Sequence, residues 1–304
     1  MINRILVLLL LCCVQLGALE DKTVMLAVLA RNKAHTLPKY LKCIEELDYE
    51  KKLISIYINT NDNEDGTAEI LTQWVSDNKD KYRSIELEDY HVPGNPTARP
   101  HEWTGARFKI LGGIREKSLQ KTKELNCDYY FVVDCDNFIV PWTLKELLAQ
   151  DKPIIAPLLK AVPELNDAYS NYFCAVDAAG YYAADPDYYK ILNGQMRGTF
   201  KVPVVHCTYL IRAEYLDKLG YVDESHDYEF VIFSKKAREA NVDQYICNVK
   251  EFGTLLHFHK DLTLEEEKNR FKDAQSRSPE HNFNAKTQSR KEAQRPAEPI
   301  ITHK

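Results

Sequence analysis

Short apolar runs alternate with amphipathic segments through the first half of the chain, and this alternation predicts strands separated by helices. The runs "TVMLAVLA" and "KLISIYIN" are typical of buried strands, whereas the apolar residues of "HTLPKYLKCIEEL" recur at helical spacing. Strand–helix alternation implies parallel strands joined by crossover helices. The expected strands are residues 23–30, 52–59, 83–90 and 129–140, and the expected helices are residues 35–47, a segment around 68–75, and residues 103–125.

The second half of the chain is less regular and predicts an antiparallel extension of the same sheet. Its apolar runs are short and punctuated by Pro and Gly, as in "PIIAPLL" and "TFKVPVVHCTYLI". Another helix is expected around "EFVIFSKKAREA". From about Gln275 the sequence is polar, which predicts a disordered tail over residues 275–304. The expected fold class is therefore α/β, with a mostly parallel, Rossmann-like sheet in one domain over residues 19–274.

Polar clusters follow three of the predicted strands. They are "ARN" at 30–32, "NTNDN" at 59–63 and "DCDN" at 134–137. Ligands of such sheets bind beyond the carboxyl ends of the strands. We therefore expect the three clusters to converge on one edge and to form the functional site.

The cluster "DCDN" places two carboxylates close together. In an extended backbone residues i and i+2 share a face, so Asp134 and Asp136 are expected to project together, away from Cys135. Two such carboxylates repel unless they share a proton or a cation. A hard divalent cation with oxygen ligands resolves the repulsion. A strand that ends in an ordinary polar turn is the alternative, because Asp and Asn are common turn residues.

The N-terminus carries a targeting pattern. In "MINRILVLLLLCCVQLGALE", Arg4 precedes an apolar stretch, and the small residues Gly17 and Ala18 follow it. This pattern predicts a secretory signal peptide over residues 1–18. The stretch is short for a membrane span of ~20 residues. An uncleaved Golgi-type signal anchor is the alternative, because Leu16 fits the small-residue rule poorly, and no later segment is expected to cross a bilayer.

Composition narrows the class of protein. The chain has 304 residues, is 44% hydrophobic and 28% charged, and carries a net charge of −5. These values are ordinary for a soluble globular protein and argue against a nucleic-acid partner. Removal of the signal peptide leaves six cysteines, which allow 15 disulfide pairings in an oxidising compartment, and the sequence does not choose among them.

Several segments occur in an order that resembles glycosyltransferase family 25. They are "LAVLARNKAHTLPKYL", "TNDNEDGTAEIL", "HEWTGAR", "DYYFVVDCDN", "PIIAPLL", "YSNYFC", "GTFKVPVVHCTYLI" and "ICN". The likeness covers roughly residues 24 to 272 and is greatest to procollagen galactosyltransferases and to the glycosyltransferase domain of multifunctional lysyl hydroxylases. It implies a GT-A-type fold and transfer of a sugar, typically galactose, from a UDP-sugar with Mn²⁺ or Mg²⁺.

The resemblance assigns a divalent cation to Asp134 and Asp136, where it would neutralise charge that develops on the leaving diphosphate. A histidine often completes such a site in GT-A enzymes. Here "LLHFHK" offers His259, which we favour, and His257. A surface histidine beside one held by a backbone carbonyl is an equally good interpretation of either residue.

The resemblance also places nucleotide-binding residues at the ends of the first two strands, and the segment "HEWTGAR" at the start of the next helix offers two more, although a solvated helix arginine is the commoner case for Arg107. The spacing puts Trp103 and Arg107 one helical turn apart, where Arg107 would pair with phosphate. The alternative for the second strand end is an Asx-rich turn that caps the next helix. The expected nucleotide-binding residues are Arg31, Asn32, Asn61, Asp62, Trp103 and Arg107.

The catalytic base is expected within "SHDYEFVIF". The family has an acidic pair just before an apolar helix, and Glu229 matches its second position. Tyr228 replaces the first position and Asp227 lies one residue earlier, so Glu229 is favoured over Asp227. Both are also suited to a helix N-terminus because of the helix dipole. Segments expected to border the sugar and the acceptor contain Tyr169, Asn171 and His206.

Two other interpretations are carried forward. The tripeptide "HKD" at 259–261 matches part of the metal triad of an iron- and oxoglutarate-dependent oxygenase, although those enzymes need a double-sheet β architecture. A secreted binding or adhesion protein with a glycosyltransferase fold is the second. The expected partners are a UDP-sugar donor and a protein hydroxylysine or glycan acceptor. The expected location is the secretory pathway, or the periplasm or exterior of a bacterium, without a KDEL-type retention signal at "ITHK".

Overall fold

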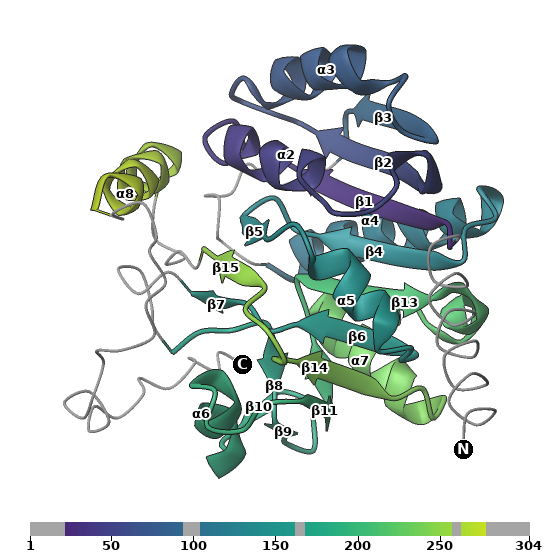
Figure 1. Cartoon of the computed structure of the whole chain (residues 1–304), viewed down its shortest axis with the longest axis vertical. Coiled ribbons are helices and arrows are strands. Elements are labelled where there is room, and N and C mark those ends of the chain that lie inside the picture. Colours follow the sequence, from purple (N-terminus) through teal and green to yellow (C-terminus); the bar gives the residue numbers. More distant parts are fainter. Residues whose placement is uncertain (1–21, 94–103, 162–167, 257–262, 278–304) are drawn as a thin grey trace, which may run out of the picture.

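An eight-stranded mixed sheet lies at the centre of the molecule (Figure 1). The structure, a computed structural model, describes residues 22–93, 104–161, 168–256 and 263–277. The strand order is β11-β14-β6-β13-β4-β1-β2-β3. These strands are β1 (Val24–Ala30), β2 (Ile54–Asn61), β3 (Ser84–Tyr90), β4 (Tyr129–Val133), β6 (Ile154–Pro157), β11 (Thr199–Val202), β13 (Thr208–Arg212) and β14 (Gln244–Cys247).

The half of the sheet from β4 to β3 is parallel, as the strand–helix alternation predicts. β1 pairs in parallel with both β2 and β4, and β2 pairs in parallel with β3. Almost every residue of β1, β2 and β4 is buried, because helices cover both faces. The crossover helices are α2 (Leu37–Glu45), α3 (Thr67–Asn78) and α4 (Gly105–Glu124).

The other half contains the predicted antiparallel extension. β13 pairs antiparallel with both β4 and β6, and β11 pairs antiparallel with β14. β14 nevertheless runs parallel to β6. The expected α/β class, with a mostly parallel sheet and an antiparallel C-terminal extension, is confirmed.

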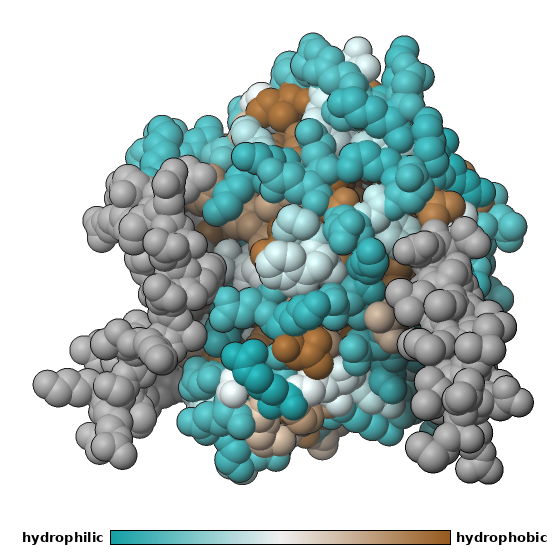
Figure 2. Space-filling model, in the orientation of Figure 1, coloured by the Kyte–Doolittle hydropathy of each residue, from teal (hydrophilic) through white to brown (hydrophobic). Residues whose placement is uncertain are grey.

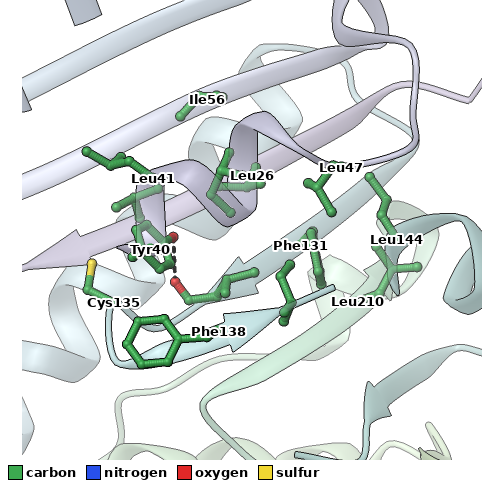
Figure 3. Close-up of a cluster of buried hydrophobic side chains, with 14 of the residues drawn as sticks. Leu26, Tyr40, Leu41, Leu47, Ile56, Phe131, Cys135, Phe138, Leu144 and Leu210 are labelled. Carbon is green, nitrogen blue, oxygen red and sulfur yellow. Dashed lines mark hydrogen bonds between the residues drawn. The ribbon is translucent and has the colours of Figure 1, made fainter. Parts of the chain in front are cut away.

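Two clusters of apolar side chains fill the two faces of the sheet. On one face the helices α2, α3 and α5 (Thr143–Ala149) pack on alternate residues of the strands. Figure 3 shows Tyr40 and Leu41 of α2 against Leu26 and Phe131, and the Tyr40 hydroxyl donates to the Val133 carbonyl at 2.8 Å. On the opposite face, α4, α6 (Pro186–Leu192) and α7 (Glu229–Glu239) contribute the packing residues.

The remaining elements are short and lie around the sheet. Gly253–Leu255 (β15) joins Asn137–Ile139 (β5) and Lys160–Ala161 (β7) in a three-stranded sheet. The C-terminal helix is α8 (Leu264–Arg277). The others are β8 (Tyr172–Phe173), β9 (Ala175–Val176), β10 (Tyr182–Ala183), β12 (Val204–Val205), and the 3₁₀ turns η1 (Lys51–Leu53) and η2 (Ala213–Lys218).

Two predicted boundaries differ from the structure. α4 begins at Gly105, where the Thr104 hydroxyl accepts a hydrogen bond from the Arg107 amide at 3.3 Å, so the helix does not extend back to residue 103. α8 extends to Arg277, past the position where the polar tail was expected to begin. The predicted signal peptide, and the tail from residue 278 onward, lie outside the described residues.

The surface is mostly polar on the face that Figure 2 shows, with small separate hydrophobic areas. No helix among the described residues is long and apolar enough to cross a membrane. The six cysteines of the described chain, Cys43, Cys127, Cys135, Cys174, Cys207 and Cys247, are all free thiols.

Candidate functional site

The ends of three parallel strands and the start of an antiparallel one meet at a single edge of the sheet. β1, β2 and β4 are parallel and in register, so the segments after Ala30, Asn61 and Val133 emerge together. β13 runs the opposite way, and its first residue Thr208 pairs with Val133. The structure thus brings the three polar clusters of the sequence together, and it adds residues 206 and 207.

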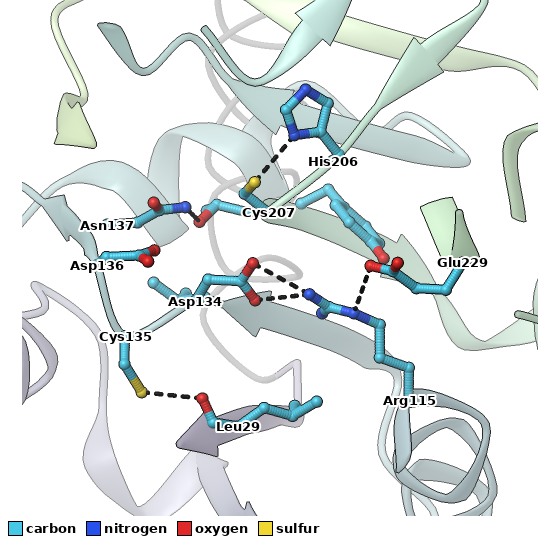
Figure 4. Close-up of polar contacts among 12 residues, drawn as sticks. Leu29, Arg115, Asp134, Cys135, Asp136, Asn137, His206, Cys207 and Glu229 are labelled. Carbon is cyan, nitrogen blue, oxygen red and sulfur yellow. Dashed lines mark hydrogen bonds and ion pairs between the residues drawn. The ribbon is translucent and has the colours of Figure 1, made fainter. Parts of the chain in front are cut away.

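The chain turns at Asp134 instead of continuing as a strand. β4 ends at Val133, and the Asn137 amide donates to the Asp134 carbonyl at 2.9 Å, which closes a turn. The Asp134 amide donates to the Cys207 carbonyl at 3.1 Å, so the turn is tied to β13. The expectation of an extended D-x-D was therefore wrong, and the polar-turn alternative is correct for the backbone. Both carboxylates nevertheless belong to the same site (Figure 4).

Arg115 of α4 lies between Asp134 and Glu229 (Figure 4). Its Nη2 donates to both oxygens of Asp134, at 2.8 and 3.0 Å. Its Nε forms an ion pair with Oε1 of Glu229 at 3.4 Å. Burial raises the pKa of both carboxyl groups, whereas Arg115 lowers it, and in each case the net shift is upward. The sequence analysis did not identify Arg115.

Lys33 is the positively charged partner of the second aspartate, Asp136. Its Nζ lies 3.3 Å from Oδ2 of Asp136 and 3.3 Å from Oε1 of Glu267, which is fully buried on α8. Nε2 of His35 lies 2.8 Å from the same Glu267 oxygen. Burial lowers the pKa of Lys33, but the two carboxylates outweigh burial and raise it. Each aspartate is thus matched to one internal cation.

Glu229 and Asp227 differ strongly in environment. Glu229 is the first residue of α7, is 5% exposed, and points toward Arg115 (Figure 4). Asp227 is half-buried and accepts a hydrogen bond from the Tyr181 hydroxyl at 2.8 Å. Only Glu229 is thus part of the same polar group as Asp134.

Aromatic side chains surround the start of α7. Tyr228 stacks on Phe108 with ring centroids 4.1 Å apart, and Phe230 lies 5.0 Å from the ring of His206. Nδ1 of His206 lies 2.9 Å from Sγ of Cys207, whose φ is 63°. Tyr169 lies 6.0 Å from His206 in the same cluster. Such flat apolar faces suit the carbon-bound hydrogens of a sugar or an extended peptide.

Asn171, expected beside these residues, has a structural role instead. It is fully buried, and its side chain binds three backbone groups in two segments. Oδ1 accepts from the Leu159 amide at 2.9 Å, and Nδ2 donates to the carbonyls of Pro157 and Thr208 at 2.9 and 3.4 Å. Both N–H donors and one acceptor position of its amide are thus bonded within the protein, which supports a structural role for Asn171.

The predicted nucleotide-binding residues of the first two loops hold those loops in shape. Asn32 and Asp62 both have positive φ, 55° and 44°. Oδ1 of Asn32 accepts from the Glu64 amide at 2.7 Å, and Asp62 accepts from the Val92 amide at 3.2 Å. Arg31 and Asn61 lie beside them at the strand ends. The Asx-rich turn predicted as the alternative is also present, because Oδ1 of Asp65 accepts from the Thr67 amide at 3.0 Å at the start of α3.

Three predicted residues, Trp103, His257 and His259, lie outside the described residues. Arg107 itself is half-buried in the first turn of α4.

The described part of the chain fits a hard divalent cation only in part. Asp134 and Asp136 are carboxylates, the donor type that Mn²⁺ and Mg²⁺ prefer, and Figure 4 shows both in one polar cluster. Within the described ranges no three His, Cys, Asp or Glu side chains form a metal-binding group. The two aspartates therefore fit as part of a ligand set.

A sequence signal for Arg115 exists. The buried positions Phe108, Gly112, Arg115, Leu119 and Thr122 form one helical stripe on α4. An arginine within a buried stripe needs a buried anionic partner, because an unpaired charge is costly there. No comparable signal marks Lys33.

Comparison with known proteins agrees with this geometry. Residues 21–275 match the family model described as "Glycosyltransferase family 25, N-terminal domain". Human procollagen galactosyltransferase 2 is 36% identical over 247 residues, which are 78% of this chain and 39% of the relative. Human inactive glycosyltransferase 25 family member 3 is 32% identical, over 76% of this chain and 40% of the relative. The chain thus spans about two fifths of the length of these curated relatives.

Among solved structures, GalNAc-T7 with UDP, GalNAc and Mn²⁺ superposes with a TM-score of 0.54. The match covers 79% of this chain and 45% of that one, at 13% identity. This likeness supports the fold, a GT-A-type arrangement of the sheet.

Proposed function

Because the chain belongs to glycosyltransferase family 25, we propose that it moves a sugar from a UDP-sugar to a hydroxyl group. The proposed sugar is galactose, and the proposed acceptor is a hydroxyl of a protein, such as hydroxylysine, or of a glycan. The names of the related procollagen galactosyltransferases support galactose as the sugar and a protein as the acceptor.

One observation carries the proposal. The site holds two carboxyl groups near one point, Asp134 and Asp136, and a separate buried carboxyl group, Glu229, on the other side of Arg115. Sugar transfer from a nucleoside diphosphate needs these two kinds of group. The aspartate pair would hold the cation that balances charge on the leaving diphosphate, and the separate carboxylate would accept the proton.

Asp134 and Asp136 would hold a divalent cation, Mn²⁺ or Mg²⁺, together with His259 or His257. A bound cation of this kind stabilises the negative charge on the leaving diphosphate. The loops that contain Arg31, Asn32 and Asp62 lie next to these aspartates at the same edge and would bind the nucleoside. Arg107 and Trp103 are proposed to bind the nucleotide from the side of α4, with Arg107 paired to phosphate.

Glu229 is the proposed general base. As the acceptor oxygen bonds to the anomeric carbon, the bond from that carbon to the diphosphate breaks and UDP leaves. The hydroxyl proton passes to the Glu229 carboxylate, so charge and atoms balance. Burial raises the pKa of Glu229 and makes the carboxylate a better proton acceptor, and Arg115 favours its ionised form.

The sheet argues against the iron- and oxoglutarate-dependent alternative. The large sheet of the described chain is mixed and has helices on both faces, instead of packing against a second large β-sheet. The non-catalytic alternative has a specific basis, because a relative named inactive is 32% identical.

We place the protein in the secretory pathway, on the basis of the N-terminal pattern.

The proposed base is tested with Glu229→Gln and a matched control two residues away, Asp227→Asn. Glu229→Gln keeps the shape of the side chain and should slow transfer from UDP-galactose by ~10²–10⁴-fold. UDP affinity, measured by calorimetry, should stay within about threefold, because the base contacts the acceptor and not the nucleotide. Asp227→Asn, which removes only the charge that faces Tyr181, should keep most of the transfer rate.

Three results would contradict parts of the proposal. Loss of transfer in Asp227→Asn alone would make Asp227 the base. Equal rates in wild type and both variants would place the base elsewhere. Wild type that binds UDP but forms no product with any acceptor hydroxyl would favour the binding protein.

A further inference from the structure

Arg115 is the central cation of the site, and its donors are only partly used. It is 4% exposed, and one nitrogen, Nη2, makes both hydrogen bonds to Asp134. Nε and Nη1 are buried without a hydrogen-bond partner among the described residues. An unsatisfied buried donor is destabilising, so two of them on one side chain call for an explanation.

The second carboxylate stands close to those donors. Oε1 of Glu229 lies 3.4 Å from Nε, which is near enough for an ion pair but outside good hydrogen-bond geometry. A small movement of the guanidinium toward Glu229 would convert this contact into a hydrogen bond. The same movement would lengthen the bonds to Asp134, because the two carboxylates lie on different sides of the guanidinium (Figure 4).

The helix that carries Arg115 is held firmly against the start of α7. A Cβ on Gly112 would lie 2.7 Å from the Tyr221 carbonyl and 3.5 Å from Cβ of Glu229. Oε2 of Glu116 accepts from the Tyr221 amide at 2.8 Å, and Nζ of Lys236 donates to the Val222 carbonyl at 2.7 Å. Only the side chain of Arg115, and not the helices, has to move between its two partners.

We propose that Arg115 is a positioning residue that links the two halves of the site: when a cation takes Asp134, Arg115 transfers its hydrogen bonds to Glu229. This inference rests on the proposed function, which assigns the cation to Asp134 and the base role to Glu229. Binding of the cation where the UDP-sugar is held would then orient Glu229, which faces the acceptor hydroxyl. Asp134 gives up Arg115 in exchange for the cation, and neither carboxylate is left without a positive partner.

The two sites must then be energetically coupled, and coupling is reciprocal. Glu229 draws Arg115 away from Asp134 and should thereby assist binding of the cation. Removal of the Glu229 charge should weaken Mn²⁺ binding as long as Arg115 is present. When Arg115 is replaced, Glu229 can affect cation binding only through its direct electrostatic attraction for the cation.

A double-mutant cycle on Mn²⁺ affinity tests this link without any measurement of activity. The proteins are wild type, Glu229→Gln, Arg115→Met and the double variant, and the probe is Mn²⁺ alone, with free ion measured by electron paramagnetic resonance. We expect Glu229→Gln to raise the Mn²⁺ Kd by about 3–10-fold in wild type, and by less than about twofold in the Arg115→Met background, where the guanidinium is absent. Arg115→Met alone should lower the Kd, because the competitor for Asp134 is gone.

The opposite pattern would overturn the proposal. If Glu229→Gln changes the Kd as much or more in the Arg115→Met background, Glu229 acts by direct charge and not through Arg115. If Arg115→Met is poorly folded by circular dichroism, Arg115→Lys replaces it. A lysine keeps the charge but offers one nitrogen, so the effect of Glu229→Gln on the Kd should be smaller than in wild type. An effect equal to that in wild type would contradict a role for the guanidinium.

Asp134→Asn separates this inference from the proposed function. Unchanged Mn²⁺ affinity in that variant would show that Asp134 does not hold the cation, and it would overturn the metal site and the link together. Reduced affinity in Asp134→Asn without coupling in the cycle would overturn the link and leave the proposed function in place. Lys123→Met, which removes an exposed cation from the same helix, is the charge control and should leave the Kd within about twofold.

Discussion

At the scale of single residues, Asp128 joins the starts of β1 and β4. Its Oδ2 accepts from the amide and the hydroxyl of Thr23, both at 2.8 Å, and its own amide donates to that hydroxyl at 3.0 Å. Burial raises the pKa of Asp128, but the bonds from Thr23 and the charge of Lys22 outweigh it and lower the pKa. Asp128 therefore contributes stability when it is ionised.

Asp128→Asn should lower the free energy of unfolding at pH 7 by about 1 kcal/mol, a small value because the carboxylate is 40% exposed. A carboxyl group with a lowered folded-state pKa stabilises the fold above its unfolded pKa of about 3.9 and loses that effect as the pH falls through the folded value. Urea titrations at pH 7 and pH 3 should thus show a difference that shrinks at pH 3. Asp217→Asn, at a carboxylate that is 83% exposed, is the control and should change little at either pH. If the difference in unfolding free energy between wild type and Asp128→Asn is the same at pH 7 and pH 3, the charge of Asp128 is not its cause.

Single residues also show what the sequence can and cannot predict about the site. The D-x-D pattern correctly predicted that Asp134 and Asp136 share a site, although the backbone turns there, because the carboxyl end of a buried parallel strand fixes the position. Arg115 and Lys33 were missed. Their partners, Glu229 and Glu267, are distant in sequence. The stripe on α4 indicates that Arg115 needs an anionic partner, but a local pattern does not identify which residue that partner is.

At the scale of elements, α4 carries two adjacent glycines with opposite surroundings. A Cβ on Gly112 would meet the Tyr221 carbonyl at 2.7 Å, whereas a Cβ on Gly113 has nothing within 4 Å. Both glycines lie in the interior of a 20-residue helix, where alanine is favoured by about 0.5–1 kcal/mol. Gly113→Ala should therefore stabilise the protein by that amount.

Gly112→Ala should instead destabilise it by about 1–3 kcal/mol, because overpacking against a fixed carbonyl outweighs the gain in helix propensity. The thermal midpoints of the two variants, measured side by side, should move in opposite directions. An equal rise in both would show that α4 is free to move away from the loop at Tyr221, in conflict with the rigid contact described for this helix.

The elements were the most predictable part of the structure. Buried parallel strands give long apolar runs, and the helices between them give clear periodicity, so β1, β2, α2 and α3 were expected close to their observed positions. β5, β7 and β15 were not separated from their surroundings. Each has two or three residues, too few for a period of two to show, and they are defined by pairing across the chain.

At the scale of the whole molecule, the site joins segments from both halves of the chain. Residues 31–33, 62 and 134–136 belong to the first half, and Glu229 and Glu267 to the second. A ligand that binds only the folded protein stabilises all of these segments at once. At a concentration 100 times its Kd the expected gain is about 2.7 kcal/mol.

UDP with Mn²⁺ at such concentrations should thus raise the thermal midpoint by several degrees, since 1 kcal/mol corresponds to about 2–4 °C for a domain of this size. Differential scanning calorimetry with UDP alone, Mn²⁺ alone and both together measures the effect. Asp134→Asn should lose most of the gain from the mixture. AMP with Mn²⁺ is the control for nonspecific nucleotide binding, and an equal shift with AMP would argue against a uridine site.

The position of β13 has a consequence for the order in which the protein is made. β13 lies between β4 and β6, although both of its neighbours precede it in the chain. A ribosome therefore releases β4 and β6 with an open apolar edge between them, and the gap closes only after residues 208–212 have emerged. Pairing of such distant segments is slow, and exposed strand edges invite pairing with other chains. The nascent protein is thus expected to depend on chaperones until its second half has been synthesised.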